Sequence, residues 1–230
     1  MTTSTLSPKK LLVAGIALSA ALGLGACSSD DSASAAPASS SSSQASRPEP
    51  IASLPAIPAG GSTAVALDAN FVSALGTLGL TPGTIGGATL TDGSISFPIT
   101  GGTVTVFDKS SGYRPYVQGT LLHQNSGLSL TAGATTVELT NFTVDPGTPA
   151  RLFGDVAVNG QQAAASAPLF DLDGTTLKPI SMDSSGNAVL QGTTVKLSPE
   201  AAGLLDKTFG TDALKGGLVI GIATITVPTK

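Results

Sequence analysis

One stretch of the sequence gathers the side chains best suited to bind a ligand. Residues 112–130, GYRPYVQGTLLHQNSGLSL, contain both tyrosines of the chain, Tyr113 and Tyr116, together with Arg114 and the single histidine, His123. A tyrosine phenolate can ligate haem iron, a second residue can tune it, and a guanidinium can pair with a propionate. These four residues are therefore the candidate ligand-binding residues.

Part of this stretch is similar to a known family. The run from Gly119 to Leu130, a strand leading into His123 and then Ser-Gly-Leu, resembles the HtaA-type haem-uptake surface domains of actinobacteria. Such domains are β-rich, secreted and often anchored, and they use a tyrosine with a nearby histidine. The resemblance implies haem as the ligand, Tyr113 or Tyr116 as its axial residue, and His123 as the partner of that tyrosine.

The sequence alone favours a plainer interpretation of the same stretch. In that interpretation, a half-exposed strand uses its tyrosine and histidine rings to cover the core, and their polar tips form hydrogen bonds. No cofactor is then expected. A structure that shows a pocket lined by Tyr113, Tyr116 and His123 would favour ligand capture instead.

The patterns of enzymatic sites are missing from the sequence. Ser126 lies three residues from His123, but no G-x-S-x-G elbow presents a nucleophile. The H-E-x-x-H motif and the P-loop are absent, and a chain with one histidine and one cysteine lacks the usual zinc ligands. A hydrolase that uses a pair of carboxylates is the remaining enzymatic alternative. Because most acids sit beside glycine or proline in turns, we expect a protein that is not an enzyme.

One acidic pair has the spacing that begins a calcium loop. Asp171 and Asp173 precede Gly174, but the sixth loop position would be Thr176 and the twelfth Met182, where an EF-hand needs glycine and glutamate. We therefore interpret this segment as a hairpin turn.

The N-terminus indicates where the protein resides. Residues 1–26 have a start that contains two lysines, an apolar run from 11 to about 24, and small residues before Cys27, which is the layout of a cleaved signal peptide. Leu24-Gly25-Ala26-Cys27 resembles the lipobox of bacterial lipoproteins. The resemblance implies cleavage between Ala26 and Cys27 and a diacylglyceryl group on the Cys27 sulfur. The alternative is an ordinary cleavage site with a bystander cysteine.

Charge narrows the range of partners. The signal peptide holds two of the eleven basic residues and none of the fifteen acidic ones, so the mature chain has nine basic and fifteen acidic residues. This balance excludes a nucleic-acid partner, and an anionic membrane surface would repel it. We expect attachment to the lipid bilayer through acylated Cys27, at the outer face of the bacterial cytoplasmic membrane or in the cell envelope. An envelope polymer or a protein remains open as a further partner, because we expect the displayed domain to serve binding, adhesion or structural roles, with capture of haem or another small ligand as the alternative.

The mature chain divides into a linker and one folded domain. Residues 27–61 are rich in serine, alanine and proline, so we expect a disordered tether. Residues 62–230 show short alternating apolar runs broken by turn residues, which predict a mainly β domain of about ten short strands. We favour a β-sandwich over a closed barrel.

Several local features of this domain follow from the pattern. Alternating residues at 95–99 and 104–106 predict a hairpin across TGG, and those at 128–130 and 137–139 predict a second one. A change of parity predicts a β-bulge near Asn141, and Pro98 predicts a strand end or an edge. The run 218–227 predicts a central strand. Two short helices are expected within 65–79 and 195–210, capped by Asp68 and Ser198.

Overall fold

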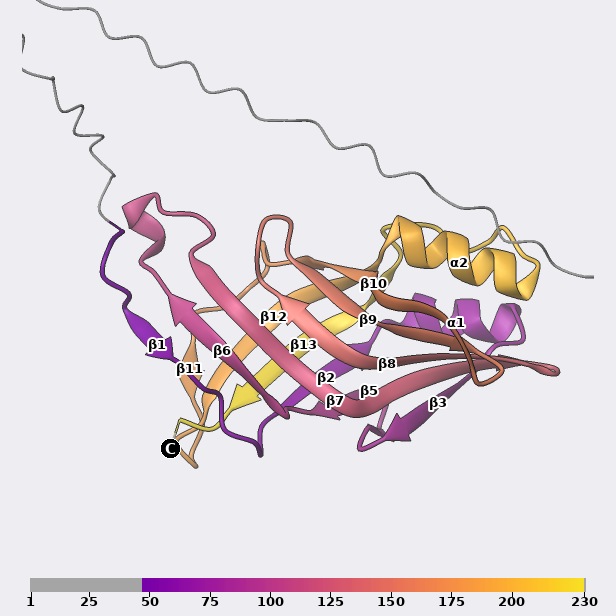
Figure 1. The fold of residues 1–230 in the computed structure, drawn as a ribbon, viewed down its shortest axis with the longest axis horizontal. Helices are drawn as coiled ribbons and strands as arrows, with labels where there is room; N and C mark the ends of the chain where they lie inside the picture. Colours follow the sequence, from indigo (N-terminus) through magenta and orange to yellow (C-terminus); the bar gives the residue numbers. More distant parts are fainter. Residues whose placement is uncertain (1–46, 230) are drawn as a thin grey trace, which may run out of the picture. The chain divides into compact units, whose positions relative to one another are not determined.

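The computed structural model describes residues 47–229, and these form one antiparallel sheet of thirteen strands with two α-helices (Figure 1). The mainly β class is confirmed. The strand order is β1-β6-β7-β8-β9-β10-β12-β13-β2-β5-β4, with β3 paired to β7 and β11 paired to β12. The strands are β1 (Ala52–Leu54), β2 (Ser62–Leu67), β3 (Thr81–Gly86), β4 (Thr89–Thr91), β5 (Ser94–Pro98), β6 (Gly101–Val106), β7 (Val117–Ala132), β8 (Thr135–Asp145), β9 (Arg151–Val158), β10 (Gln161–Asp173), β11 (Ser181–Met182), β12 (Ala188–Leu197) and β13 (Val219–Val227).

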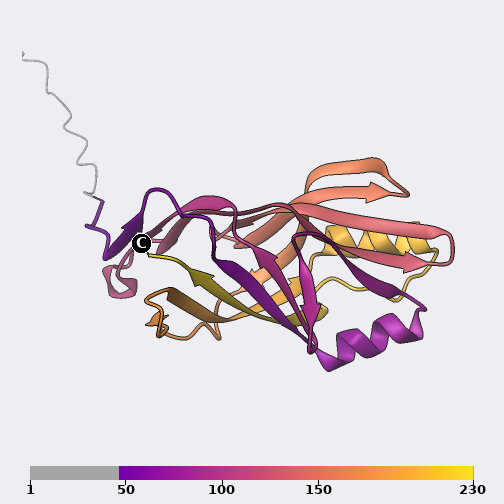
Figure 2. The same cartoon turned by 90° about the horizontal axis from the view of Figure 1, so that it is seen from below.

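The sheet curls on itself, so that β6, β7, β8 and β9 face β12, β13, β2 and β5 in a second layer (Figures 1 and 2). The long strand β7 pairs with β6 along its first half and with β3 along its second. Two consecutive amides join the ends of the curl: Ile99 donates to the Gly61 carbonyl before β2, and Thr100 donates to the Leu122 carbonyl of β7. Two layers packed over one core are therefore produced by a single continuous sheet.

The two predicted hairpins have different outcomes. Leu128 pairs with Leu139 and Ala132 with Thr135, so the hairpin of β7 and β8 is confirmed. The hairpin predicted across TGG is wrong, because β5 pairs with β2 and β4 while β6 pairs with β1 and β7. The short link between β5 and β6 crosses from one layer to the other, and the alternating pattern is the same for a crossing as for a turn.

Other local predictions are confirmed. The register of β8 shifts between Thr140 and Thr143, and Asn141 has a positive φ of 55°, so the bulge lies where parity changes. Strand β5 ends at Pro98. Strand β13 is central, between β12 and β2.

Both helices begin at the predicted caps. Helix α1 (Ala69–Thr77) follows Asp68, whose carboxylate accepts from the amides of Asn70 and Phe71. Helix α2 (Pro199–Phe209) follows Ser198, whose hydroxyl accepts from the Ala201 amide. Because β2 and β12 both run antiparallel to β13, the two helices leave the sheet at the same end.

Part of the expected linker lies in the sheet. Ala52–Leu54 forms β1 on the edge of β6, and Ile57 is buried with Ile99 and Leu121 in a small apolar cluster. Burial of one large aliphatic side chain offsets part of the ordering entropy of such a segment. The structure therefore places residues 52–57 in the folded region, whereas the rest of the linker before Arg47, the signal peptide and Cys27 lie outside the described residues.

The main core lies near the helix end of the curl. It joins Val137 and Val156, in the layer of β6 to β9, to Val195 and Ile220, in the layer of β12, β13, β2 and β5. Both helices contribute to it through residues such as Leu75 and Leu205. Within residues 47–229, neither helix has the length and apolarity required to cross a membrane.

Candidate functional site

His123 is buried at the centre of the curled sheet. Strand β7 carries it, and its side chain is 1% exposed. Nε2 lies 2.8 Å from Oγ1 of the buried Thr63 on β2, in the opposite layer. The ring packs edge to face on Phe97, with the ring centroids 6.3 Å apart, and Nδ1 has no hydrogen-bond partner. One imidazole nitrogen is therefore fixed by Thr63, and the whole ring is shielded from solvent.

Burial decides the charge of this imidazole. It lowers the pKa of His123 from 6.5 to about 4, because the charged ring loses its hydration, and the backbone of Phe142 on the neighbouring strand opposes this only in part. At neutral pH the ring is uncharged and can accept a hydrogen bond or ligate a metal ion.

Tyr113, Arg114 and Tyr116 lie on the loop between β6 and β7. The 3-10 helix η1 (Lys109–Ser111) begins the loop, capped by Asp108, and the Phe107 amide closes it by donating to the Tyr116 carbonyl at 2.7 Å. Both backbone and side-chain contacts to Ser110 hold the pKa of Asp108 below its usual value. The loop is thus fixed by its own hydrogen bonds.

The two tyrosines of this loop have different surroundings. The Tyr113 ring packs on the fully buried Phe107, with centroids 4.8 Å apart. The half-buried Tyr116 ring faces two cations, with Lys109 Nζ 4.6 Å and Arg114 Cζ 6.0 Å from its centroid. Positive charge therefore gathers at Tyr116.

A cavity of about 310 Å³ opens between the two layers, and its wall is mostly aliphatic and aromatic. It brings together Arg114, Tyr116 and His123 but not Tyr113. Arg114 and Thr148 on its wall are exposed, whereas His123 and Thr63 are buried. The cavity therefore runs from an exposed rim to a buried polar pair.

The structure separates the two residues that the resemblance placed together. Residues 117–122 pair with β6 in unbroken register, so this part of the chain is extended. At about 3.3 Å per residue, the seven steps from Tyr116 to His123 span roughly 23 Å. A side chain at each end cannot meet the other at one iron atom or in one hydrogen bond. His123 has Thr63 as its partner instead.

No Asp or Glu from residues 47–229 lines this cavity, so the pair of carboxylates that a hydrolase needs is not found there. Asp171 lies 3.0 Å from Arg151, and Asp173 lies 2.8 Å from Lys196. The described residues contain no cluster of three or more histidine, cysteine or acidic side chains that would hold a metal ion.

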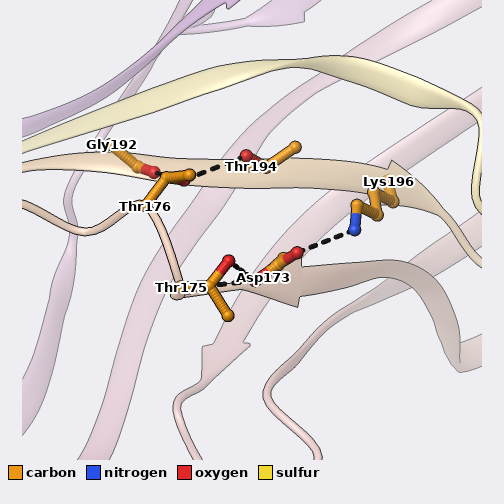
Figure 3. Close-up of polar contacts among 6 residues, drawn as sticks. All are labelled: Asp173, Thr175, Thr176, Gly192, Thr194 and Lys196. Atoms are coloured by element: carbon orange, nitrogen blue, oxygen red, sulfur yellow. Dashed lines mark hydrogen bonds and ion pairs between the residues drawn. The ribbon is translucent and has the colours of Figure 1, made fainter.

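Asp173 fixes a segment of the cavity wall (Figure 3). Its carboxylate accepts from Lys196 Nζ and from the amide and hydroxyl of Thr175, and the lysine followed by the threonine holds the pKa of Asp173 well below its usual range. The neighbouring Thr176 donates to the Gly192 carbonyl at 2.6 Å. These contacts attach the segment after β10 to β12, and this segment contributes Gly174 and Leu177 to the cavity wall. Asp171 and Asp173 themselves lie within β10, so the hairpin turn predicted there is instead a longer connection, residues 174–187, that carries β11.

Sequence reasoning did not find Thr63. It lies sixty residues before His123, on a strand whose alternating pattern indicates only a buried position. Phe97 and Phe142, whose rings pack edge to face with centroids 5.2 Å apart on the same cavity wall, belong to alternating strands, and that pattern indicates a core position and not a site. The curl of the sheet brings these strands together, and local sequence carries no signal of it.

The fold is similar to that of a solved domain of HtaA. The C-terminal domain of HtaA from Corynebacterium glutamicum matches with a TM-score of 0.51 and 13% identity, over 75% of this chain and 97% of that chain. The N-terminal domain of HtaA from the same organism matches with a TM-score of 0.48 and 15% identity, over 75% and 99%. The heme binding protein HtaB of that organism matches with a TM-score of 0.47 and 11% identity, over 76% and 95%.

The match to the HtaA C-terminal domain confirms the structural resemblance to HtaA-type domains, and at this identity it concerns the fold alone. Neither a protein-family model nor a curated protein sequence matches this chain.

Proposed function

We propose that this protein is a non-enzymatic capture module that binds an apolar small molecule with an anionic group in the cavity between its two layers. The observation that carries the proposal is the cavity itself, which joins an exposed arginine to an apolar interior. Volumes of this size and largely apolar walls with a few polar groups are typical of ligand sites. The apolar body of the ligand would lie between the layers, and its anionic group would stay at the rim beside Arg114.

Haem is the first ligand to test, because the sequence and the fold both resemble HtaA-type domains. The residues at the rim fit it: Tyr116 offers a phenolate ligand, and Arg114, on the same loop, offers a cation for a propionate. When bound, haem would supply an iron centre for this phenolate. His123 is too far along β7 to share that iron with Tyr116, so we assign the tyrosine and not the histidine.

Titration of the full chain with hemin tests this assignment. We expect a Soret shift that saturates, and a loss of affinity of at least tenfold in Tyr116→Phe, since a phenyl ring cannot ligate iron. Tyr113→Phe is the matched control, because the Tyr113 ring packs on Phe107 and does not line the cavity. No Soret shift, or an equal loss in both variants, would overturn the assignment.

We further propose that the module is displayed on the outside of the cytoplasmic membrane, tethered to the bilayer by lipid on Cys27. The support is the similarity of Leu24-Gly25-Ala26-Cys27 to a lipobox at the end of an apolar run. The two acyl chains of a diacylglyceryl group give stable anchoring, whereas a single acyl chain binds a bilayer only marginally. An inhibitor of the lipoprotein signal peptidase should leave a heavier precursor, and Cys27→Ser should release the protein from membranes. Unchanged migration under the inhibitor contradicts the proposal.

A further inference from the structure

A second cavity, of about 500 Å³, is lined by residues of β1, β6, β7, β11, β12 and β13. Strands β1 and β11 lie at the end of the sheet away from the helices (Figure 1). The register of the strands defines the cavity wall on the side of β1, β6 and β7. Ala52 pairs with Val106 and Val106 with Val117, and Leu54 pairs with Val104, so these side chains share the inner face of β1, β6 and β7. Ser53 and Thr105 alternate with these residues, and their hydroxyls lie 3.4 Å apart.

The register of β11, β12 and β13 defines the opposite wall. Met182 pairs with Ala188 and Ala188 with Val227, while Leu190 pairs with Ile225. Ile225 and Val227 pack on the buried cluster inside the curl, so their cross-strand partners Leu190 and Ala188 also point inward. Two aliphatic walls of moderate side-chain size therefore face each other across unfilled space.

The wall of the second cavity is mostly aliphatic. Among the described residues that line it, the polar side chains are the hydroxyls of Ser53, Thr103, Thr120 and Thr229, and none is charged. A water molecule in a cavity needs two to four polar partners, whereas apolar cavities stay dry and take up apolar ligands. The chemistry of the walls thus selects a hydrocarbon.

The second cavity lies beside the first and has an apolar rim. The two cavities share five wall residues: Val117, Val144, Pro146, Leu190 and Ile225. Ile180 and Met182, at the wall of the second cavity, are 50% and 59% exposed. An exposed apolar rim at a cavity marks a place where an apolar ligand or membrane makes contact.

We propose that the second cavity binds one long acyl chain, with its polar head left in water at the rim formed by Ile180 and Met182. This site is separate from the haem assignment, which concerns Tyr116 and Arg114 in the first cavity. The head stays outside because a charge in an apolar interior without a partner is costly.

Fluorescence of cis-parinaric acid, a long-chain fatty acid that becomes emissive in apolar surroundings, tests the proposal. The full chain carrying Cys27→Ser is used, so that its own acyl group cannot fill the cavity. We expect saturable binding, competed by oleic acid. A parallel titration with a lysophospholipid as competitor distinguishes a free fatty acid from a membrane lipid as the source of the chain.

Two alanine-to-phenylalanine variants separate the cavities. Ala188→Phe fills the second cavity and should lower the affinity for parinaric acid at least tenfold, with hemin titration unchanged. Ala150→Phe, on the wall of the first cavity alone, is the matched control and should leave parinaric acid binding within twofold.

Met182→Gln, at the exposed rim, is a second variant that does not depend on repacking, and it should weaken parinaric acid binding several-fold. Absence of saturable binding in the full chain, or equal binding by Ala188→Phe with a native circular dichroism spectrum, would overturn the proposal. Hemin binding in either case leaves the haem assignment standing.

Discussion

The pKa of His123 predicts a loss of stability in mildly acidic solution. In the folded state burial lowers this pKa to about 4, from the ordinary value of 6.5 that the unfolded chain regains. As the pH falls below 6.5, the His123 imidazole becomes protonated in the unfolded state but stays neutral in the folded state. The stability contributed by the neutral imidazole is therefore complete above pH 6.5 and is lost as the pH falls towards 4.

The magnitude follows from the size of the shift. Each unit of pKa corresponds to about 1.4 kcal/mol, so the full loss is about 3 kcal/mol, of which about 2 kcal/mol falls between pH 7 and pH 5. Most carboxylates with lowered pKa values, such as Asp155 and Asp183, act with the same sign but below their ordinary pKa of 3.8. The interval from pH 7 to pH 5 therefore reports mainly on His123.

Urea unfolding at pH 7.0 and pH 5.0 measures this difference. The control is the double variant His123→Leu with Thr63→Val, which removes both hydrogen-bonding partners and leaves no buried polar group without one. We expect the double variant to lose the difference between the two pH values. The single histidine also gives one set of imidazole NMR signals, which should not titrate above pH 5 in the folded protein.

Two results would refute the reasoning. One is a wild-type protein with equal stability at pH 7.0 and pH 5.0. The other is a double variant that keeps the whole pH dependence, since the responsible group would then lie elsewhere.

Two further predictions concern single positions. Gly203→Ala should stabilise the protein by about 1 kcal/mol, because this exposed position in α2 has nothing within 4 Å of an added Cβ. Gly154→Ala should destabilise the protein, because the added Cβ would lie 2.7 Å from Leu169 Cδ1 and 2.8 Å from Phe142 Cδ1. The opposite order of the two thermal midpoints would contradict this prediction. Ser198→Ala should lower the free energy of unfolding, measured in urea, by about 2 kcal/mol, whereas loss of an N-cap alone usually costs about 1 kcal/mol. The reason is that the buried Ser198 hydroxyl also donates to the Pro168 carbonyl at 2.7 Å. A loss no larger than that of Asp68→Ala would show that this second hydrogen bond contributes nothing.

Local features of the fold were predictable because neighbouring residues decide them. The caps Asp68 and Ser198, the bulge at Asn141 and the end of β5 at Pro98 each depend on the geometry of a few adjacent residues. The pairing of β5 was not predictable in this way. Its alternating residues suit any neighbouring strand, and the choice between β6 and β2 depends on how the whole sheet curls.

The candidate site shows the same division. The sequence identified Arg114, Tyr116 and His123, because tyrosine, arginine and histidine are scarce in this chain and gather in one stretch. It could not show that Tyr113 packs away from the cavity, or that an extended strand keeps Tyr116 and His123 about 23 Å apart. Tyr116 and His123 are close in the sequence, which suggested that they are close in space. The extended strand between them instead holds them apart.

By itself, the sequence determined that this protein is mainly β, where its helices begin, and which few side chains have ligand-binding chemistry. Only the tertiary structure decided that Thr63 fixes His123, that burial keeps this imidazole neutral, and that two apolar cavities lie side by side between the layers. The physical reason is that hydrogen-bonded caps and turns depend on local backbone geometry. Cavities and pKa shifts depend instead on which distant strands the curled sheet brings face to face.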